Sequence, residues 1–396
     1  MKIALLTETW HPFTNGVVTH IEVLAEGLTS LGHQVLIMTS DPYIQENTLD
    51  EQGVFRCPGK PLKRVYGYAL APPFGLERYR FLKQFQPEVI HIHQEFGMGT
   101  FGLMSSRLLQ VPLVYTLHTA YDEYLHYLAP PPLIPLVRFL SRGYVKFLAS
   151  SASLVTGPSE KSAAYIKARG VKTPFVYIPN SINQQKFNPE AILPVYRQHF
   201  RENLGIDQDA TLALFVGRLG KEKSVDVLLQ YWHESVGSSE NLHLLIVGEG
   251  PESEPLKTLV KATGLHQQVH FLGKVPHDHM THCYGASDLF VTASTTEMMS
   301  IAMLEAQSMG LPVLQRFDPF NACQISEGLN GWLFNEADEF GRHLFSYHRL
   351  STAEKDDWRH RCRQYVSLQD ASDLAHRLLS VYAQAQLNME NLHEVL

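Results

Sequence analysis

Residues 289–306 read Leu-Phe-Val-Thr-Ala-Ser-Thr-Thr-Glu-Met-Met-Ser-Ile-Ala-Met-Leu-Glu-Ala. The apolar run at 289–292 predicts a buried strand, and the segment from about Ser300 predicts a helix. A strand that passes through a short turn into a helix is the repeating unit of parallel α/β sheets. If the unit recurs along the chain, the protein is a parallel sheet with helices on both faces.

The same unit recurs on both sides of this stretch. Short runs rich in Val, Ile and Leu alternate with segments of helical pattern, such as 17–31. The runs lie at 2–7, 34–39, 89–93, 113–117, 154–156 and 175–178, and again at 212–216, 242–247, 269–272, 289–292 and 311–314. We therefore predict an α/β protein with two Rossmann-like, doubly wound domains, whose ligands bind at the carboxyl ends of the strands.

The domain boundaries follow from where the pattern pauses. The polar stretch 179–194 predicts a linker, so we expect a first domain at 1–187 and a second at 188–369. The last segment, about 370–396, is helical and amphipathic, with an apolar stripe through Leu374, Leu378, Leu379 and Tyr382. Two such domains in tandem leave a cleft that can hold a nucleotide on one side and a second substrate on the other.

Composition narrows the cellular setting. The four cysteines are scattered without CxxC spacing, which argues against a disulfide framework. Glu8 lies too early for the apolar core of a signal peptide, and no run of about 18 apolar residues predicts a membrane span. We therefore expect a cytoplasmic protein.

Charge is spread unevenly along the chain. The part up to Pro189 has 17 basic and 13 acidic residues, whereas the rest has 16 basic and 27 acidic residues. A basic first half suits an anionic membrane surface, and the alternative is chance surface composition. No nucleic-acid partner is expected.

Two carboxylates flank the turn quoted above. Glu297 precedes the predicted helix and Glu305 lies one to two turns inside it. A helix N-terminus suits a diphosphate, and carboxylates accept hydrogen bonds from the vicinal hydroxyls of a ribose or hexose. The alternative is that both are ordinary helix acids.

A second polar turn follows the strand at 212–216. It contains Gly217, Arg218 and Lys223, and Gly248 follows the next strand. Arg and Lys at a strand end suit phosphate oxygens, and the glycines allow a tight turn or the close approach of a ligand. A solvated basic turn is the alternative reading.

Together these motifs resemble glycosyltransferase family 4. The resemblance runs in order from Lys2 to about Phe334. It rests on Glu297-x7-Glu305, Gly-Arg218-x4-Lys223, Gly248-Glu-Gly-Pro, Gly310-Leu-Pro-Val, the opening 7–18, His91-Ile-His93 and Ile178-Pro-Asn180. It implies a GT-B fold, in which two Rossmann-like domains face a central cleft and a C-terminal helix crosses back to the first domain. It also implies a nucleotide-sugar donor and retention of anomeric configuration.

The resemblance assigns roles to particular residues. Arg218 and Lys223 would hold the donor diphosphate, Glu305 the ribose and Glu297 the transferred sugar. His118 would face the reacting sugar, and Gly16 would let the backbone approach the phosphates. The predicted catalytic residues are His118, Arg218, Lys223 and Glu297. The predicted donor-binding residues are Gly16, Gly217, Arg218, Lys223, Gly248, Glu297, Ser300 and Glu305.

One departure bears on activity. The family usually has a glycine three residues after the first glutamate, where this chain has Ser300. That glycine lets the backbone close on the donor sugar. A non-catalytic relative that binds a sugar nucleotide, or that supports another transferase, is therefore an alternative.

The acceptor side is predicted from two neighbouring segments. The aromatic stretch 115–127, with Tyr121 and Tyr124, looks like the same region in bacterial enzymes that glucosylate diacylglycerol. Just downstream, Arg138, Arg142 and Lys146 recur every four residues and share one face of a helix. A basic amphipathic helix can lie on an anionic membrane, and the alternatives are loop packing for the tyrosines and an ordinary domain helix.

No catalytic metal and no permanently bound cofactor are expected. The pair Asp207 and Asp209 precedes a strand and is interpreted as a turn, and His277, His279 and His282 as surface histidines.

We predict transfer of a hexose, with glucose from UDP-glucose to diacylglycerol as the leading hypothesis, by a peripheral protein at the inner face of the cell membrane. One alternative keeps the reaction and changes the substrates, for example mannose to an inositol phospholipid. A phosphorylase or an epimerase is a weaker alternative.

Overall fold

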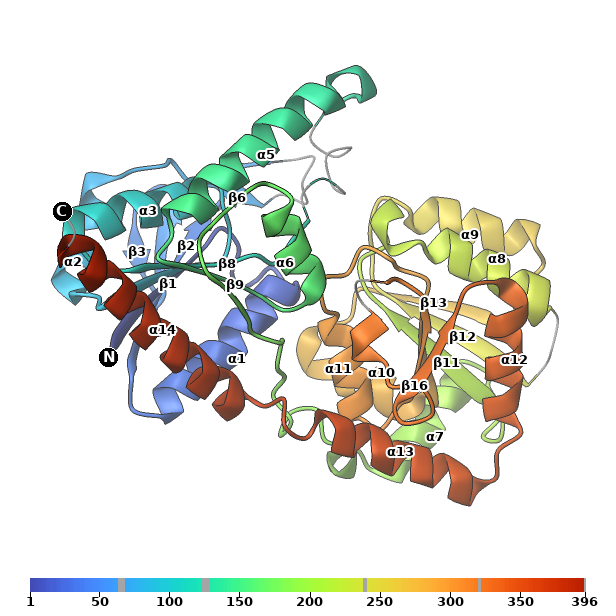
Figure 1. Cartoon of the computed structure of the whole chain (residues 1–396). Helices are drawn as coiled ribbons and strands as arrows, with labels where there is room; N and C mark the ends of the chain where they lie inside the picture. Colours follow the sequence, from blue (N-terminus) through green and yellow to red (C-terminus); the bar gives the residue numbers. More distant parts are fainter. Residues whose placement is uncertain (63–67, 121, 123–128, 238–240, 320–321, 395–396) are drawn as a thin grey trace. The chain divides into compact units, whose positions relative to one another are not determined.

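The computed structural model describes residues 1–62, 68–120, 122, 129–237, 241–319 and 322–394. Tyr121 and Tyr124, two predicted acceptor contacts, lie outside the described residues. The chain forms two compact units, shown in Figure 1: Met1–Ser181 with Ala371–Leu396, and Ile182–Asp370. The first unit therefore ends near the start of the polar stretch 179–194, a few residues before the boundary at 187 that the sequence suggests.

The first unit is built on a sheet with eight strands in the described part of the chain, in the order β10-β9-β8-β7-β1-β2-β4-β3. Neighbouring strands are parallel except β3 and β4. The bounds are β1 Lys2–Thr7, β2 Gln34–Asp41, β3 Thr48–Leu49, β4 Phe55–Pro58, β7 Val89–Ile92, β8 Leu113–Thr116, β9 Leu154–Gly157 and β10 Phe175–Tyr177. The strand order reverses between β1 and β7, so the turns after these strands flank the position where doubly wound sheets bind ligands.

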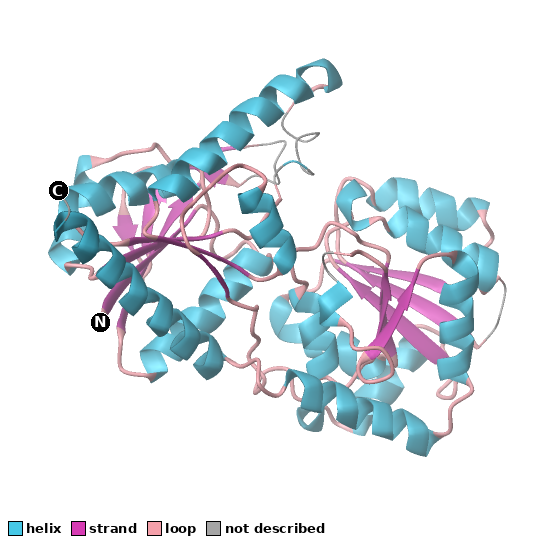
Figure 2. Ribbon diagram, viewed as in Figure 1, coloured by secondary structure: helices cyan, strands magenta, loops and turns pink. Residues whose placement is uncertain are grey.

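Helices cover both faces of this sheet, as Figure 2 shows. They are α1 Gly16–Ser30, α2 Leu76–Phe85, α3 Gly97–Leu109, α5 Ile134–Ser151, α6 Glu160–Lys167 and α14 Ala371–Glu394. A small separate pair consists of β5 Lys60–Pro61 and β6 Ala69–Leu70, and η2 spans Pro131–Leu133. Within the described residues, no helix is both long enough and apolar enough to cross a membrane.

The C-terminal helix α14 packs on α1 and so belongs to the first unit. Its predicted stripe is buried: Leu374, Leu378 and Tyr382 are fully inaccessible and pack into the same core as Ile21. Gly27 makes the close approach of the two helices possible, because a Cβ at Gly27 would lie 2.1 Å from the carbonyl oxygen of Ala371. The chain thus returns to its first unit, as the resemblance implies.

The second unit has a fully parallel sheet with six strands among the described residues, in the order β13-β12-β11-β14-β15-β16. The strands are β11 Thr211–Val216, β12 Leu242–Val247, β13 Val269–Gly273, β14 Leu289–Thr292, β15 Val313–Arg316 and β16 Gly331–Phe334. The helices are α7 Pro194–Asn203, α8 Val225–Ser235, α9 Ser253–Ala262, α10 Met280–Ala286, α11 Ile301–Ser308, α12 Ala337–His348 and α13 Thr352–Val366. Short 3-10 turns among the described residues are η3 Pro189–Ala191, η4 Lys221–Lys223, η5 His277–His279 and η6 Ala322–Gln324. Here the order reverses between β11 and β14, so the turns after these two strands meet.

Most apolar runs of the sequence are strands, with one shift. The run at 311–314 was predicted as a strand, but β15 begins at Val313. Pro312 cannot donate to a ladder, and Gly310 has a left-handed φ of 82° that ends the preceding helix. The short strands β4 and β16 were not predicted, because four residues with a charged or aromatic interruption carry little periodicity.

Candidate active site

Glycines bring together two strand ends in the second unit. Gly217 follows β11 and its N–H donates to the carbonyl of Val247 over 3.0 Å. Gly248 follows β12 with φ 138°, and a Cβ there would lie 1.9 Å from the carbonyl oxygen of Gly217. Only glycine fits at Gly248, so its first role in the fold is to let these two turns touch. Contact of either glycine with a donor stays a prediction.

Arg218 points to a buried carboxylate in its own turn. Its Nε donates to Oε1 of Glu222 over 3.0 Å, and the Glu222 side chain is only 1% exposed. Gly220 makes room for that side chain, because a Cβ at Gly220 would lie 2.4 Å from the Glu222 carboxylate. Arg218 is itself 26% exposed, so one side of the guanidinium faces solvent. Glu222 therefore fixes a cation at the end of β11.

Lys223 and Glu297 meet across the turns after β11 and β14. The Lys223 Nζ lies 2.5 Å from Oε1 of Glu297, and Ser294 Oγ donates to the same oxygen over 3.1 Å. Thr296 Oγ1 ties the second turn to the first by donating to the carbonyl of Glu222 over 2.9 Å. The structure thus brings together Arg218, Lys223 and Glu297 where the strand order reverses. An arriving diphosphate would compete with Glu222 and Glu297 for the two cations.

Glu305 lies on α11 and is 5% exposed. Its Oε1 lies 2.9 Å from Nε2 of His277, and its Oε2 accepts a hydrogen bond from the Tyr284 hydroxyl over 2.7 Å. Burial, together with the charge of Glu305, raises the pKa of Tyr284 well above its ordinary value, so this phenol keeps its proton and donates. The carboxylate that the resemblance assigns to a ribose is therefore held in place by two side chains.

His277 corrects an interpretation made from the sequence. It was grouped with His279 and His282 as a surface histidine, but it is half-buried and contacts Glu305. The Lys186 ammonium donates to Nδ1 of His277 over 3.1 Å, so the ring proton belongs on Nε2, which donates to Glu305. The contact joins residues 28 positions apart, so no local sequence pattern predicts it.

Ser300 is the N-cap of α11 and has φ −75° and ψ 118°, a conformation open to any residue. Its N–H donates to Oε1 of Gln324 over 2.7 Å, and Gln324 Nε2 donates back to its carbonyl over 3.0 Å. The backbone at this position does not require glycine. The chain uses a serine to cap the helix and clamps the turn with a glutamine.

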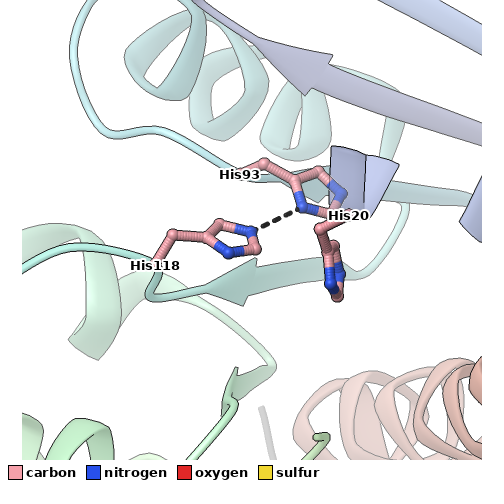
Figure 3. A group of neighbouring side chains, drawn as sticks. All are labelled: His20, His93 and His118. Atoms are coloured by element: carbon pink, nitrogen blue, oxygen red, sulfur yellow. Dashed lines mark hydrogen bonds between the residues drawn. The ribbon is translucent and has the colours of Figure 1, made fainter. Parts of the chain in front are cut away.

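A different set of side chains occupies the equivalent place in the first unit. His93 follows β7 and His118 follows β8, and His93 Nδ1 lies 3.1 Å from His118 Nε2 (Figure 3). His91 stacks beside His93 with ring centroids 4.0 Å apart, and its Nδ1 lies 2.8 Å from the hydroxyl of Tyr382 on α14. The structure therefore places His118, a predicted catalytic residue, in a cluster of imidazoles.

His20 on α1 completes this histidine cluster, which consists of His20, His91, His93 and His118. Burial lowers the pKa of His20 to about 4, against a weaker raising effect of the Asn180 hydrogen bond. Burial, and next the proximity of the other imidazoles, also lower the pKa of His91, His93 and His118 well below the ordinary value. The cluster is neutral at physiological pH.

Gly16 is exposed in the first turn of α1, which follows β1. The Asn15 side chain caps this helix by accepting from the N–H groups of Val17 and Val18 over 2.9 and 3.0 Å. Two amide groups at this helix end are thus already satisfied within the chain. A phosphate contact at Gly16 stays a prediction.

Helix α5 carries the predicted membrane-side cations. Arg138, Arg142 and Lys146 are all exposed, and Arg142 pairs with Asp122 over 3.2 Å. Buried residues of this helix, Val145, Leu148 and Ala149, lie in its second half. The first half extends beyond the sheet, as Figure 1 shows, and presents large apolar side chains to solvent. These are Leu133 just before it, at 49% exposure, then Leu136 at 56%, Phe139 at 75% and Leu140 at 59%. The interpretation as an ordinary domain helix fits only the second half.

Comparison with known proteins agrees with this geometry. Residues 14–186 match the family model "Glycosyltransferase Family 4", and residues 197–363 match "Glycosyl transferases group 1". The chain is 32% identical over 356 residues to the alpha-monoglucosyldiacylglycerol synthase of Acholeplasma laidlawii, with 87% of each chain covered. It is 24% identical over 343 residues to a GDP-mannose-dependent alpha-mannosyltransferase of Corynebacterium glutamicum, with 85% of this chain and 78% of that protein covered.

The fold has a solved counterpart. The crystal structure of Anabaena Alr3699/HepE in complex with UDP and glucose superposes with a TM-score of 0.73 at 18% identity, over 97% of this chain and 99% of that one. Fold and site together define a glycosyltransferase with the GT-B fold. The chain belongs to glycosyltransferase family 4 and is a hexosyltransferase.

Proposed function

We propose that this protein transfers glucose from UDP-glucose to diacylglycerol, with retention of anomeric configuration, at the inner face of the cell membrane. The observation that carries the proposal is the meeting of Arg218, Lys223 and Glu297 at the position where the strand order of the second unit reverses. Glu305 lies in the helix that follows Glu297. Two cations beside two carboxylates suit a sugar joined to a diphosphate.

The chemistry explains why these residue types are needed. When the bond between the sugar and the diphosphate breaks, negative charge builds on the departing phosphate oxygens. Arg218 and Lys223 would stabilise that charge more strongly than the charge of the bound donor, and so lower the barrier. Glu222 and Glu297 hold the two cations in position in the absence of donor.

The proposed acceptor, diacylglycerol, is supported by features of the first unit. The relative from Acholeplasma laidlawii is named for a glucosyl diacylglycerol product, and the exposed apolar side chains of α5 lie among basic ones. An apolar face with adjacent Arg and Lys suits an anionic lipid interface, where a diacylglycerol hydroxyl is presented. Catalysis at that surface would need neither a membrane span nor a metal.

The direct test is incubation with radiolabelled UDP-glucose and vesicles of anionic lipid that contain diacylglycerol. We expect a labelled glycolipid whose anomeric linkage matches that of the donor, and no product without diacylglycerol. An inverted linkage would contradict retention. Labelling of a different acceptor alone would reject diacylglycerol while leaving the transferase activity intact.

The role of α5 has its own test. Phe139→Ser should weaken co-sedimentation with anionic vesicles about tenfold, because it removes a large apolar side chain from the interface. Leu108→Ser is the matched control, since Leu108 on α3 of the same unit is also exposed, at 57%. Equal effects of the two substitutions would reject a specific role for α5.

A second donor is favoured by one comparison. The Corynebacterium glutamicum relative is named for GDP-mannose, so the same geometry is compatible with mannose transfer, for example to an inositol phospholipid. Thermal shift with UDP-glucose, UDP and GDP-mannose separates the two, because a ligand that binds the folded state raises its melting temperature. Stabilisation by GDP-mannose alone would replace glucose in the proposal.

The non-catalytic alternative is tested without an acceptor. A catalytic transferase should hydrolyse its donor slowly when water takes the acceptor's place, and Arg218→Ala should abolish that hydrolysis. Donor binding without any turnover, in the presence of every acceptor tried, would support a non-catalytic partner protein.

A further inference from the structure

We propose that His20, His93 and His118 form a binding site for one divalent transition-metal ion, such as Zn²⁺, in the first unit. One ring nitrogen from each residue lies within 4.8 Å of the others, and Figure 3 shows the three side chains converging from α1 and from the ends of β7 and β8. The chemistry proposed above uses no metal.

The tautomer of His20 is one that a metal site can use. Asn180 Oδ1 accepts from His20 Nδ1 over 3.1 Å, so the His20 proton belongs on Nδ1 and the lone pair on Nε2. A ligand histidine held through its other nitrogen by an oxygen is the usual support of a metal site.

Two buried ring nitrogens of this histidine cluster make no hydrogen bond within the described residues. In the described part of the chain, His20 Nε2 and His93 Nε2 are buried without a hydrogen-bond partner. A buried polar atom left without a partner is costly, and an ion that accepts its lone pair removes the cost. His118 is only half-buried, which gives an ion access from solvent.

The spacing requires a modest contraction. Zinc binds imidazole nitrogen at about 2.0–2.1 Å, which places the nitrogens around a tetrahedral ion about 3.3 Å apart. A 3.1 Å hydrogen bond joins His93 Nδ1 to His118 Nε2, so the rings have to rotate to turn the Nε2 atoms of His20 and His93 and one nitrogen of His118 toward the ion. Three imidazoles leave a fourth position for water.

A functional consequence follows that rests on the proposed function. If His118 faces the reacting sugar, an ion on His118 occupies that place, and binding of Zn²⁺ would inhibit transfer. The site would then make the enzyme sensitive to free zinc. Metal binding itself is independent of this consequence.

The test is equilibrium dialysis of the full chain with Zn²⁺, combined with the visible absorption spectrum of the Co²⁺ form. We expect one tightly bound ion per chain and the intense absorption of a four-coordinate Co²⁺ site. His20→Ala and His118→Ala should each weaken binding at least about tenfold and remove that absorption. Two variants are used so that the test does not depend on one that fails to fold. His118 is less buried than His20, so its substitution is less disruptive to folding.

His270→Ala is the matched control. His243 and His270 in the second unit also have ring nitrogens 3.1 Å apart, but among the described residues they belong to no group of three metal-ligating side chains. We expect no change in the tight site when His270 is replaced. Equal loss in all three variants, or wild-type binding in His20→Ala, would overturn the proposal. Tight binding without inhibition would leave the site standing and reject only the role of His118 in transfer.

Discussion

The two units share a doubly wound parallel arrangement of strands but carry opposite chemistry near the reversal of strand order. In both, the strand order reverses beside the first strand, between β1 and β7 in one and between β11 and β14 in the other. In the second unit the turns there carry ion pairs, Arg218 with Glu222 and Lys223 with Glu297. In the first unit neutral histidines follow β7 and the neighbouring strand β8. The fold decides where side chains converge, and the side chains decide which ligand is suited to that place.

The two units differ in the charge of the side chains that they bury. In the second unit the side chains stay charged, and each lies beside a side chain of opposite charge. Such a site suits a ligand that is itself charged. The first unit places four imidazoles so deep that their charged forms are excluded. Such rings can hydrogen-bond to sugar hydroxyls or bind a metal, but they cannot neutralise a diphosphate.

The strongest challenge to this contrast is removal of one cation. Arg218→Ala should lower kcat about 10²- to 10³-fold with a smaller change in the KM for the donor, because its charge acts mainly in the transition state. Steady-state kinetics with the labelled donor measures both constants. Arg342→Ala is the control, because Arg342 is 70% exposed in the same unit and pairs with Glu339.

A loss of activity in Arg218→Ala counts only if the protein still folds. The substitution takes an ion-pair partner from the buried Glu222, so urea unfolding should accompany the kinetics. A folded Arg218→Ala variant with wild-type kcat would break the assignment of the diphosphate to the second unit.

The stability of the two units should respond differently to a fall in pH. Each buried histidine of the first unit takes up a proton on unfolding between about pH 6.5 and its lower folded pKa, so the unit loses stability as the pH falls through that range. Glu8 acts in the opposite direction, because burial raises its pKa to about 7 and it gains stability as the pH falls. The effect of four histidines is larger than that of one carboxyl. The free energy of unfolding of this unit should therefore fall by about 1.4 kcal/mol per pH unit for each proton that the unfolded state binds in excess of the folded state.

Hydrogen exchange between pH 7 and pH 5 measures this difference within one chain. Protection factors in β7 and β8 should fall at least about tenfold per pH unit more than those in β11 and β12. In the second unit burial lowers the pKa of His270 to about 4 and also lowers the pKa of His343 and His348, but these rings are partly exposed and contribute less. His20→Asn should reduce the slope of the first unit. A parallel loss of protection in both units would contradict the neutral cluster.

The next effect sharpens the description of the charged site. His277→Ala should raise the KM for the donor about tenfold and change kcat little, because the Glu305 carboxylate loses one of the two side chains that hold it in place. His279→Ala is the matched control, since His279 is exposed in the same short 3-10 turn. A fall in kcat with constant KM would show that His277 acts in the chemical step instead of positioning Glu305.

The smallest expected effect concerns Ser300. Ser300→Gly restores the usual residue of the family but should change kcat/KM less than about twofold, because the backbone there needs no glycine. It should lower stability by only a few tenths of a kcal/mol through loss of the N-cap, measured by urea unfolding. A large gain in activity would indicate that Ser300 obstructs the donor.

The sequence by itself determined the two doubly wound units, the return of the last helix to the first unit and the motifs of the family. The units and motifs follow from local patterns, namely apolar strand runs, glycine turns and charged residues just after strands, and the return of the last helix follows from the family resemblance that those motifs carry. Tertiary structure alone decided that Lys223 meets Glu297, that His277 holds Glu305, and that His20 joins His93 and His118. Each contact joins segments 25 or more residues apart. Only the order and register of parallel strands bring them together, and no periodicity within a single segment records that order.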